Sequence, residues 1–350
     1  MARLEEIIVR AKERRASDVH IAPALPVRIR VDGALVDLDD RALMADECVA
    51  LSIEAAGEAF EAIKACGELD LAGTFADGIR CRINIYQSMR GPCLAVRILS
   101  TSIPELSALG LPLVVREFPK YRKGIVLVTG ETGSGKSTTL ASIIDEINHT
   151  RSDHIITLED PIEYVYAPDR CSIDQREIGR DTKSYAEGLR AILREDPDVI
   201  LIGEMRDLET IETALTAAET GHLVLGSLHT QSAADSVDRL VDVFPESRQR
   251  QIRLQLSMVL QAVLSQQLLP RARGEGRVVA CEAMIVNHAI RNLIREGKTP
   301  QIENTLATTA EIGAVTMDNM LVQMVRSRAI TRETAIGAAR DKEFVKRNAR

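Results

Sequence analysis

The sequence predicts an α/β protein in which a small N-terminal domain precedes a larger domain built on a parallel sheet. Three observations carry this prediction. Short apolar, β-branched runs alternate with segments of helical periodicity through the middle of the chain. A glycine-rich segment connects one of these runs to the helical segment after it. A stretch containing Pro104 and Pro112 separates this region from the N-terminal part of the chain.

Residues 1–98 have the pattern of a small α/β domain. A first helix is predicted from four apolar residues at helical spacing, namely Leu4, Ile7, Ile8 and Ala11. A second helix is expected over residues 47–65. Strands with alternating or apolar character are expected at 17–21, 27–31, 34–36, 78–86 and 93–98, with a hairpin turn at Asp32-Gly33. The last two strands also carry arginines, and a solvated strand face is the ordinary interpretation of such charges.

Residues 99–112 are the expected linker, and residues 113–350 are the expected second domain. The strands predicted there lie at 125–129, 155–158, 199–202 and 223–225. Because helical segments separate them, we expect a parallel sheet with helices on both faces. From about residue 231 the chain is predicted to be mostly helical, with a hairpin-like interruption at 273–276.

The segment Gly130–Ser137 fits the P-loop pattern G-x-x-x-x-G-K-[ST] between a predicted strand and a predicted helix. Its glycines allow backbone N–H groups to turn inward, and the helix N-terminus adds partial positive charge. Lys136 is expected to reach the β- and γ-phosphates, and Ser137 is expected to offer its hydroxyl to Mg²⁺. The predicted nucleotide-binding residues are Gly130, Glu131, Thr132, Gly133, Ser134, Gly135, Lys136, Ser137 and Thr138. The sequence therefore predicts a site for a nucleoside triphosphate.

Polar residues follow three of the predicted strands, where ligands gather in a doubly wound sheet. Hydrolysis of ATP needs a carboxylate that activates water, a second one near the metal and a group that senses the γ-phosphate. Glu163 and Glu204 are the candidates for the first two roles, and His229 is the candidate for the third. The alternatives are an acidic helix N-terminus for Glu204 and a structural histidine for His229.

Composition restricts the class of protein. A net charge of −7, an aromatic content of 3% and the absence of tryptophan disfavour a nucleic-acid binder that stacks bases. The six cysteines form no C-x-x-C pair, so we expect buried reduced thiols rather than a zinc site or a disulfide framework. No run of eighteen apolar residues and no apolar signal core is found, so the chain is expected in the cytoplasm.

Four boxes in this order resemble the secretion ATPase superfamily. They are the P-loop, the acidic box 159–163, the Walker B segment 201–207 and the histidine box from His222 to His229. Residues 17–21 and 30–33 resemble the N-terminal domain of that family. Residues 289–298 resemble the signature of its branch that retracts type IV pili. The resemblance covers nearly the whole chain.

The resemblance implies a homohexameric ring with a PAS-like N-terminal domain and a RecA-like ATPase domain with a helical C-terminal part. It implies that ATP and Mg²⁺ bind, that Glu163 is the general base and that Glu204 lies near the metal with Ser137. By the same analogy His222 and His229 form the histidine-box pair, and Arg82 and Arg97 complete the site. One departure is Glu131, where the family usually has proline, and it puts nucleotide affinity in question.

The function that the resemblance implies is ATP-driven retraction of type IV pili. The implied partners are the inner-membrane platform protein and the pilus machinery, with a paralogous ATPase left open. The chain would then work at the cytoplasmic face of the inner membrane. The alternatives are a pilus-extension or type II secretion ATPase, a nucleotide-dependent accessory subunit that hardly hydrolyses ATP, and a RecA-like nucleic-acid motor. The first commonly carries a longer N-terminal region and a four-cysteine zinc module, which this sequence does not have.

Overall fold

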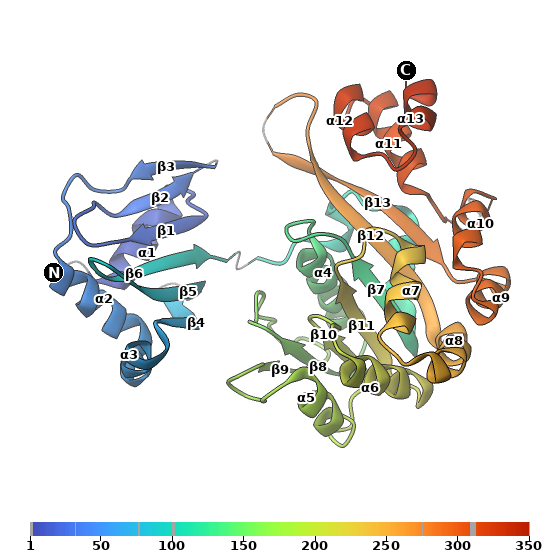
Figure 1. The fold of residues 1–350 in the computed structure, drawn as a ribbon, viewed down its shortest axis with the longest axis horizontal. Coiled ribbons are helices and arrows are strands. Elements are labelled where there is room, and N and C mark those ends of the chain that lie inside the picture. Colours follow the sequence, from blue (N-terminus) through green and yellow to red (C-terminus); the bar gives the residue numbers. More distant parts are fainter. Residues whose placement is uncertain are drawn as a thin grey trace. The chain divides into compact units, whose positions relative to one another are not determined.

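In the computed structural model, the chain is described at residues 3–31, 33–75, 78–99, 102–274, 276–308 and 313–349. It forms two compact units (Figure 1). The first consists of Met1–Ser102 with Pro161–Val165, and the second consists of Ile103–Asp160 with Tyr166–Arg350.

The first unit is an antiparallel sheet with the strand order β3-β2-β1-β6-β5-β4. Its strands are β1 Asp18–Ile21, β2 Arg28–Val31, β3 Ala34–Asp37, β4 Glu68–Phe75, β5 Ile79–Ser88 and β6 Gly91–Ile98. Its helices are α1 Leu4–Glu13, α2 Ala45–Ala56 and α3 Ile63–Cys66. The buried side chains of α1 and of the strands form one core.

Most expectations for the first unit are confirmed, including the helix at the start and the β2–β3 hairpin. Asp32 of the predicted turn lies outside the described residues. Strand β4, which pairs with β5 along its whole length, was not predicted from the sequence. Its alternation is weak because Ala72, Gly73 and Thr74 interrupt the apolar residues.

The second unit is built on a sheet of order β13-β12-β7-β11-β10-β8-β9. Its strands are β7 Gly124–Thr129, β8 His154–Glu159, β9 Ser172–Glu177, β10 Val199–Ile202, β11 Leu223–Leu228, β12 Leu260–Pro270 and β13 Arg277–Ile285. Only the pairing of β12 with β13 is antiparallel among these strands. The carboxyl ends of the four central strands, β7, β11, β10 and β8, therefore lie along one edge.

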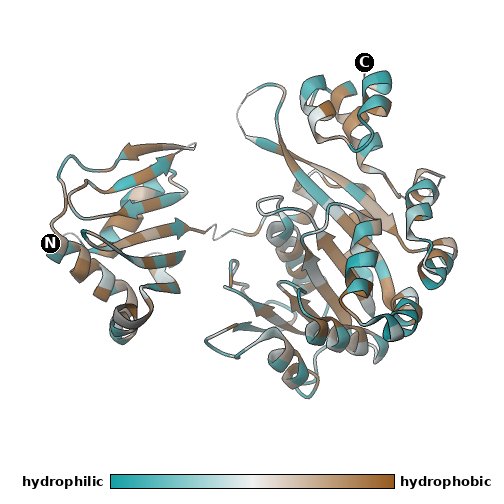
Figure 2. Ribbon diagram, in the orientation of Figure 1, coloured by the Kyte–Doolittle hydropathy of each residue, from teal (hydrophilic) through white to brown (hydrophobic). Residues whose placement is uncertain are grey.

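Ten α-helices of the described chain belong to this unit. They are α4 Lys136–Thr150, α5 Tyr185–Ile192, α6 Leu208–Glu219, α7 Ala233–Asp242, α8 Glu246–Val259, α9 His288–Glu296, α10 Ile302–Thr308, α11 Met317–Arg326, α12 Arg332–Ala338 and α13 Lys342–Asn348. Apolar residues of α5 to α9 share a core with Ile125 and Leu127 of β7. Helix α4 contacts β7 and β11 without joining that core, so it covers the other face. The apolar colour of the central strands agrees with burial from both sides (Figure 2).

The prediction of a mostly helical chain after residue 231 is wrong for residues 260–285. Strands β12 and β13 extend the sheet there, and their hairpin encloses the predicted interruption, of which residue 275 is not described. The run Val278-Val279-Ala280-Cys281 favours a strand, whereas Gln261, Gln266 and Gln267 in β12 hide the apolar pattern.

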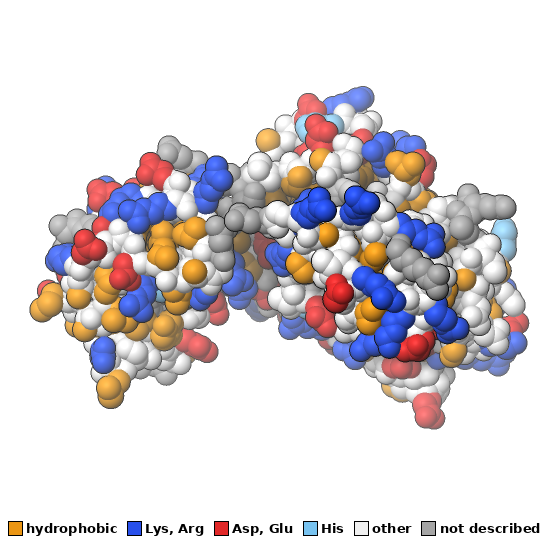
Figure 3. All heavy atoms as spheres, turned by 90° about the horizontal axis from the view of Figure 1, so that it is seen from above, with side chains coloured by type: hydrophobic (Ala, Val, Ile, Leu, Met, Phe, Trp, Pro, Cys, Tyr) orange, Lys and Arg blue, Asp and Glu red, His pale blue; other side chains and the backbone are white. Residues whose placement is uncertain are grey.

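Five of the six cysteines are buried, whereas Cys66 is exposed, contrary to expectation. No helix in the described part of the chain combines the length and apolar character needed to cross a bilayer. On the face drawn in Figure 3, Lys and Arg side chains gather over the second unit, with Asp and Glu side chains between them.

Candidate functional site

The P-loop lies between β7 and α4, as its sequence predicts. Gly130 has φ +139°, and a Cβ atom there would lie 2.3 Å from the carbonyl oxygen of Gln266 in β12. Gly133 and Gly135 have φ +80° and +92°, in the region that favours glycine. The loop therefore owes its path to glycine at three positions, and at Gly130 also to the close approach of a neighbouring strand.

Lys136 begins α4, and its Nζ donates to the carbonyl oxygens of Gly130 and Glu131 at 2.7 and 2.9 Å. This places its charge inside the curve of the loop. Ser137 and Thr138 follow in the first turn of α4, with Ser137 exposed. The arrangement provides a cation, a hydroxyl and a helix N-terminus on one side of the loop, which are the groups that hold a polyphosphate and its Mg²⁺.

Glu204 follows β10, and its carboxylate is shared by two side chains. Its Oε1 accepts from Arg206 Nε and lies 2.9 Å from His229 Nε2. Burial alone would raise the pKa of Glu204, but the hydrogen bond from Arg206 and the charge of His229 outweigh it, so the net pKa lies below the ordinary value. The two residues predicted from the ends of β10 and β11 are thus in direct contact, and the carboxylate is held ionised.

Gly203 allows the end of β10 to lie close to the end of β8. A Cβ atom on Gly203 would be 3.0 Å from Tyr185 Oη and 3.2 Å from the carbonyl oxygen of Leu158. At the end of β8, Glu159 is buried and accepts from Thr157 Oγ1 at 2.6 Å and from Gln175 Nε2 at 3.1 Å. Glu159 therefore accepts hydrogen bonds from a hydroxyl and from an amide at the end of β8.

A cavity of about 580 Å³ adjoins the P-loop. Its polar lining includes Glu131, Gln231, Gln267, Arg277, Arg340 and Lys342. Arg277 also contacts the loop, because its Nη1 donates to the carbonyl oxygen of Gly133 at 3.4 Å. The cationic residues Arg277, Arg340 and Lys342 were not predicted as site residues, because β13 and the segment after α12 are far from the P-loop along the chain.

Three predicted site residues belong to the first unit. Arg82 and Arg97 lie on β5 and β6, and Glu163 lies in the segment Pro161–Val165 that groups with this unit. Arg80 Nε lies 3.5 Å from the carbonyl oxygen of Ile162 in the same segment. The P-loop, Glu204 and His229 belong to the second unit.

Arg82 and Arg97 are direct partners across β5 and β6, so both guanidinium groups leave the same face of the sheet. Arg97 Nε donates to Asp18 Oδ1 at 3.1 Å, and Arg82 Nε lies 3.9 Å from Asp70 Oδ1. Both side chains remain about half exposed or more, at 47% for Arg82 and 66% for Arg97. Like charges placed opposite each other cost stability, and such a pair is well suited to an anionic ligand.

The two histidines of the predicted pair are at opposite ends of β11. His229 follows the strand at the P-loop edge, whereas His222 precedes it and bonds the carbonyl oxygen of Ala217 through Nδ1 at 2.8 Å. His222 caps the end of α6 and takes no part in the contacts of Glu204 that the structure gives.

Helix α9 contains the C-terminal signature, and its arginines differ in environment. Ile290 and Ile294 are buried in the core of the second unit. Arg291 is half-buried, and its Nη1 donates to the carbonyl oxygens of Ser257 and Met258 at 2.7 and 2.9 Å. These carbonyls end α8, so Arg291 is a C-terminal cap for that helix. Arg295 is exposed and donates to Asn292 at 3.1 Å.

Comparison with known proteins agrees with this arrangement. Residues 1–347 match the family model of type II/IV secretion system proteins. The type IV pilus retraction ATPase PilT of Pseudomonas aeruginosa is 43% identical over 336 residues, which are 95% of this chain and 96% of that protein. A twitching motility protein of Neisseria gonorrhoeae is 48% identical over 276 residues, 79% of this chain and 74% of that protein.

A crystal structure of the pilus retraction motor PilT with bound ADP has a TM-score of 0.93 and 45% identity. It covers 99% of this chain and 100% of its own. The resemblance stated from the four boxes is thereby confirmed, as is the fold of an N-terminal α/β domain followed by a P-loop ATPase domain with a helical C-terminal part. The chain belongs to the type II/IV secretion system protein family, the family of the secretion ATPases.

Proposed function

We propose that this chain is an ATP hydrolase that powers the retraction of type IV pili and hence twitching motility. The single observation that carries the proposal is the P-loop edge of the second unit, where Lys136, Glu204 and His229 follow three neighbouring parallel strands. A relative that matches 95% of this chain is named a pilus retraction ATPase, and one that matches 79% of it is named a twitching motility protein.

ATP would bind with its phosphates on the P-loop backbone, and Lys136 would move from the loop carbonyls to the β- and γ-phosphates. Ser137 and Glu204 are the residues proposed to hold Mg²⁺, directly or through water. A hydroxyl and an ionised carboxylate are oxygen donors that suit this cation, and the lowered pKa of Glu204 keeps its charge at neutral pH.

His229 is the proposed sensor of the γ-phosphate. Its Nε2 lies 2.9 Å from Glu204, so a phosphate oxygen that approaches His229 would compete with this contact. Glu163 is the proposed general base, and Arg82 and Arg97 are proposed to neutralise charge on the transferred phosphoryl group. These three residues lie outside the second unit. Hydrolysis would therefore depend on the arrangement of first and second units within the ring.

The larger assembly is also a proposal. We place six copies in a ring at the cytoplasmic face of the inner membrane, with the platform protein of the pilus machinery as the partner. A paralogous ATPase is a further candidate partner. The proposed domains are residues 1–98 and 113–350, and rotation about the linker 99–112 after phosphate release would supply the movement.

A twitching bacterium that lacks its own retraction ATPase provides the test. The wild-type chain should restore twitching, whereas Glu204→Gln should not restore it and should reduce ATP turnover on the order of 10²-fold. Arg190→Ala, which removes an exposed ion pair with Glu209, is the matched control and should behave as wild type. Full ATP turnover by the wild type without any restored movement would refute the retraction role and leave the ATPase intact.

A further inference from the structure

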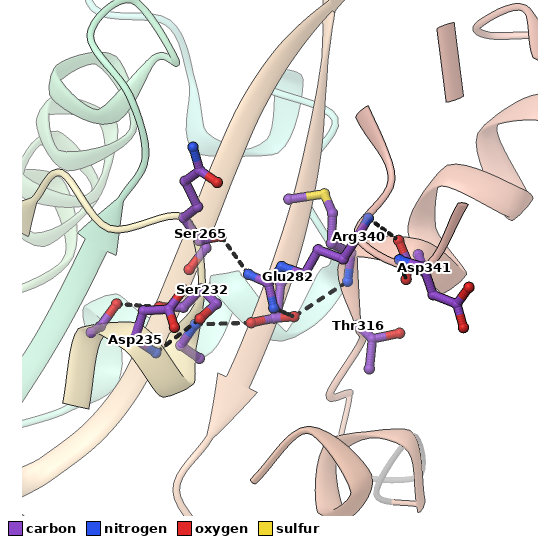
Figure 4. Close-up of polar contacts among 12 residues, drawn as sticks. Ser232, Asp235, Ser265, Glu282, Thr316, Arg340 and Asp341 are labelled. Atoms are coloured by element: carbon purple, nitrogen blue, oxygen red, sulfur yellow. Dashed lines mark hydrogen bonds and ion pairs between the residues drawn. The ribbon is translucent and has the colours of Figure 1, made fainter. Parts of the chain in front are cut away.

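A buried carboxylate on β13 takes no part in the site described above. The side chain of Glu282 is almost fully buried, and burial raises its pKa against the opposing charge of Arg340. Its Oε1 accepts from the backbone N–H of Ala233 at 2.9 Å, and its Oε2 lies 3.4 Å from Arg340 Nη1 (Figure 4). The backbone N–H of Met317 also donates to Oε2, at 3.5 Å.

These contacts bring two helix N-termini to one anion. Ala233 is the first residue of α7, and Met317 is the first residue of α11. Both N-termini carry partial positive charge, so a buried carboxylate between them is stabilised from two sides. Glu282 therefore joins the segment after β11 to the C-terminal helices.

Arg340 extends this connection to the loop that follows His229. Its Nη2 donates to the carbonyl oxygen of Gln231 at 2.6 Å. Its own backbone N–H donates to Asp318 Oδ1 at 2.9 Å, and that of Asp341 donates to Asp318 Oδ2 at the same distance. The segment between α12 and α13 is thus fixed to α11, and the guanidinium of Arg340 holds the loop.

Gln231 in turn contacts the P-loop. Its Nε2 donates to Glu131 Oε1 at 2.7 Å. Its backbone is fixed by Arg340 at its own carbonyl and by Glu282 at Ala233, two residues further on. Because the backbone of Gln231 is already held at these two points, its hydrogen bond to Glu131 costs only the rotamer freedom of the side chain.

We propose that Gln231, held by Arg340 and Glu282, is a positioning residue that keeps the carboxylate of Glu131 away from bound phosphates. The C-terminal helices would then set nucleotide affinity through this tether. A carboxylate released beside a polyphosphate repels it, and this repulsion is weakened but not abolished by solvent. The inference rests on the proposed function only in that the P-loop binds phosphates.

The test is binding of N-methylanthraniloyl-ADP to the full chain, measured by fluorescence at fixed salt. Gln231→Ala should weaken binding roughly 3- to 10-fold, a range set by the modest energy of an exposed contact. Glu131→Gln removes the repelling charge, so it should bind at least as tightly as wild type. The double variant should bind like Glu131→Gln, which is a non-additive result that only coupled residues give.

Arg340→Lys tests the role of the C-terminal helices without an uncompensated buried charge. Lysine keeps a positive charge beside Glu282, but it lacks the planar fork that serves Glu282 and Gln231 together. Binding should weaken in the same range, and Glu131→Gln should again restore it. The control is Arg332→Lys on α12, whose guanidinium donates to the carbonyl oxygen of Lys346. It should bind as wild type.

Melting temperatures within a few degrees of wild type would show that the variants fold. The proposal is overturned if Gln231→Ala and Arg340→Lys bind as wild type does. It is also overturned if Glu131→Gln fails to restore binding in either background. Binding of this probe needs no hydrolysis, so a wild type that binds it without turning over ATP counts against the proposed function alone.

Discussion

At the scale of single residues, Glu204 is the proposed metal-binding carboxylate with the most clearly shifted environment. Arg206 and His229 both share its Oε1, and the resulting pKa lies below the ordinary value of a glutamate. A carboxylate that stays ionised can accept hydrogen bonds or bind a cation throughout the neutral pH range. The neighbouring Glu159 accepts hydrogen bonds from Thr157 and Gln175.

The pH dependence of turnover follows from this environment. Arg206→Ala removes the largest influence that lowers the pKa of Glu204, while desolvation remains. The pKa of Glu204 should therefore rise, and the acid limb of kcat/KM should move to higher pH. Steady-state turnover between pH 5 and 8 measures the acid limb of kcat/KM. Arg239→Ala on α7 is the control, and its acid limb should stay at the wild-type pH. An unmoved limb in Arg206→Ala would show that Glu204 does not control it.

Gly130 is the residue whose substitution should affect the P-loop most. Alanine there would place its Cβ 2.3 Å from the carbonyl oxygen of Gln266, at φ +139°. Gly221→Ala is the matched control, because its φ is +112° and no atom lies within 4 Å of an added Cβ. Both variants carry backbone strain of about 1–3 kcal/mol, but only Gly130→Ala should also lose nucleotide binding. Calorimetry with ADP measures the difference, and equal affinities would contradict it.

The residue motifs were predictable from sequence because each lies within a few positions of a strand end. Lys136 was predicted from the P-loop pattern, and Glu204 and His229 were predicted from their positions after strands of a parallel sheet. Arg277 and Arg340 could not be found in this way, since β13 and the α12–α13 connection reach the P-loop only after the chain has folded. Gln231 lies only two residues after His229 in the sequence. Its contact with Glu131, however, depends on Glu282 of β13, which holds the backbone at Ala233.

At the scale of elements, Arg291 connects α9 to the end of α8, in addition to the apolar contacts of α9 with the core. Arg291 donates to two carbonyls at the end of α8 and to Gln261 Oε1 at 3.2 Å. Helical spacing separates this residue from the apolar stripe that contains Ile290 and Ile294. The structure instead shows a long side chain that turns back to a neighbouring helix, which spacing within α9 alone does not encode.

Arg291→Ala should therefore destabilise the chain. Loss of the two carbonyl contacts of a half-buried guanidinium should lower the free energy of unfolding by about 1–3 kcal/mol. Arg295→Ala removes only an exposed contact with Asn292, and its effect should stay within about 0.5 kcal/mol. Denaturant unfolding of both variants makes the comparison. Equal stability of the two would mean that Arg291 does not act as the cap of α8.

The strands of the second unit divide into those that sequence predicts and those that it does not. The central strands β7, β8, β10 and β11 are buried on both faces, so their apolar runs are continuous. The strands that flank these four, β9 and β12, contain polar residues such as Asp174 and Gln266. Such residues weaken the local signal, and pairing with a neighbouring strand decides the conformation.

At the scale of the whole molecule, the proposed machinery is divided between two units. Arg82 and Arg97 face each other on the sheet of the first unit, and Glu163 groups with them. The P-loop, Glu204 and His229 are in the second unit. Binding of nucleotide and its hydrolysis should therefore be separable by mutation.

Substitutions of the first-unit arginines test this separation. Arg82→Ala and Arg97→Ala should each lower ATP turnover at least about 10-fold, because a cation that meets developing charge acts mainly in the transition state. Their affinity for ADP should change far less. Arg28→Ala, which removes an exposed ion pair with Asp37 on the same sheet, is the control. Unchanged turnover in both variants would remove these arginines from the site.

The proposal that the site hydrolyses ATP within a ring is tested most directly by Mg²⁺-dependent ATP turnover as a function of protein concentration. Wild type and Glu163→Gln are compared, and particle size is followed by light scattering. Wild-type turnover should rise as rings form, and it should be lost in Glu163→Gln, although the rings still form. ATP binding with negligible turnover in the assembled wild type would contradict the claim, and the chain would then be a nucleotide-dependent scaffold.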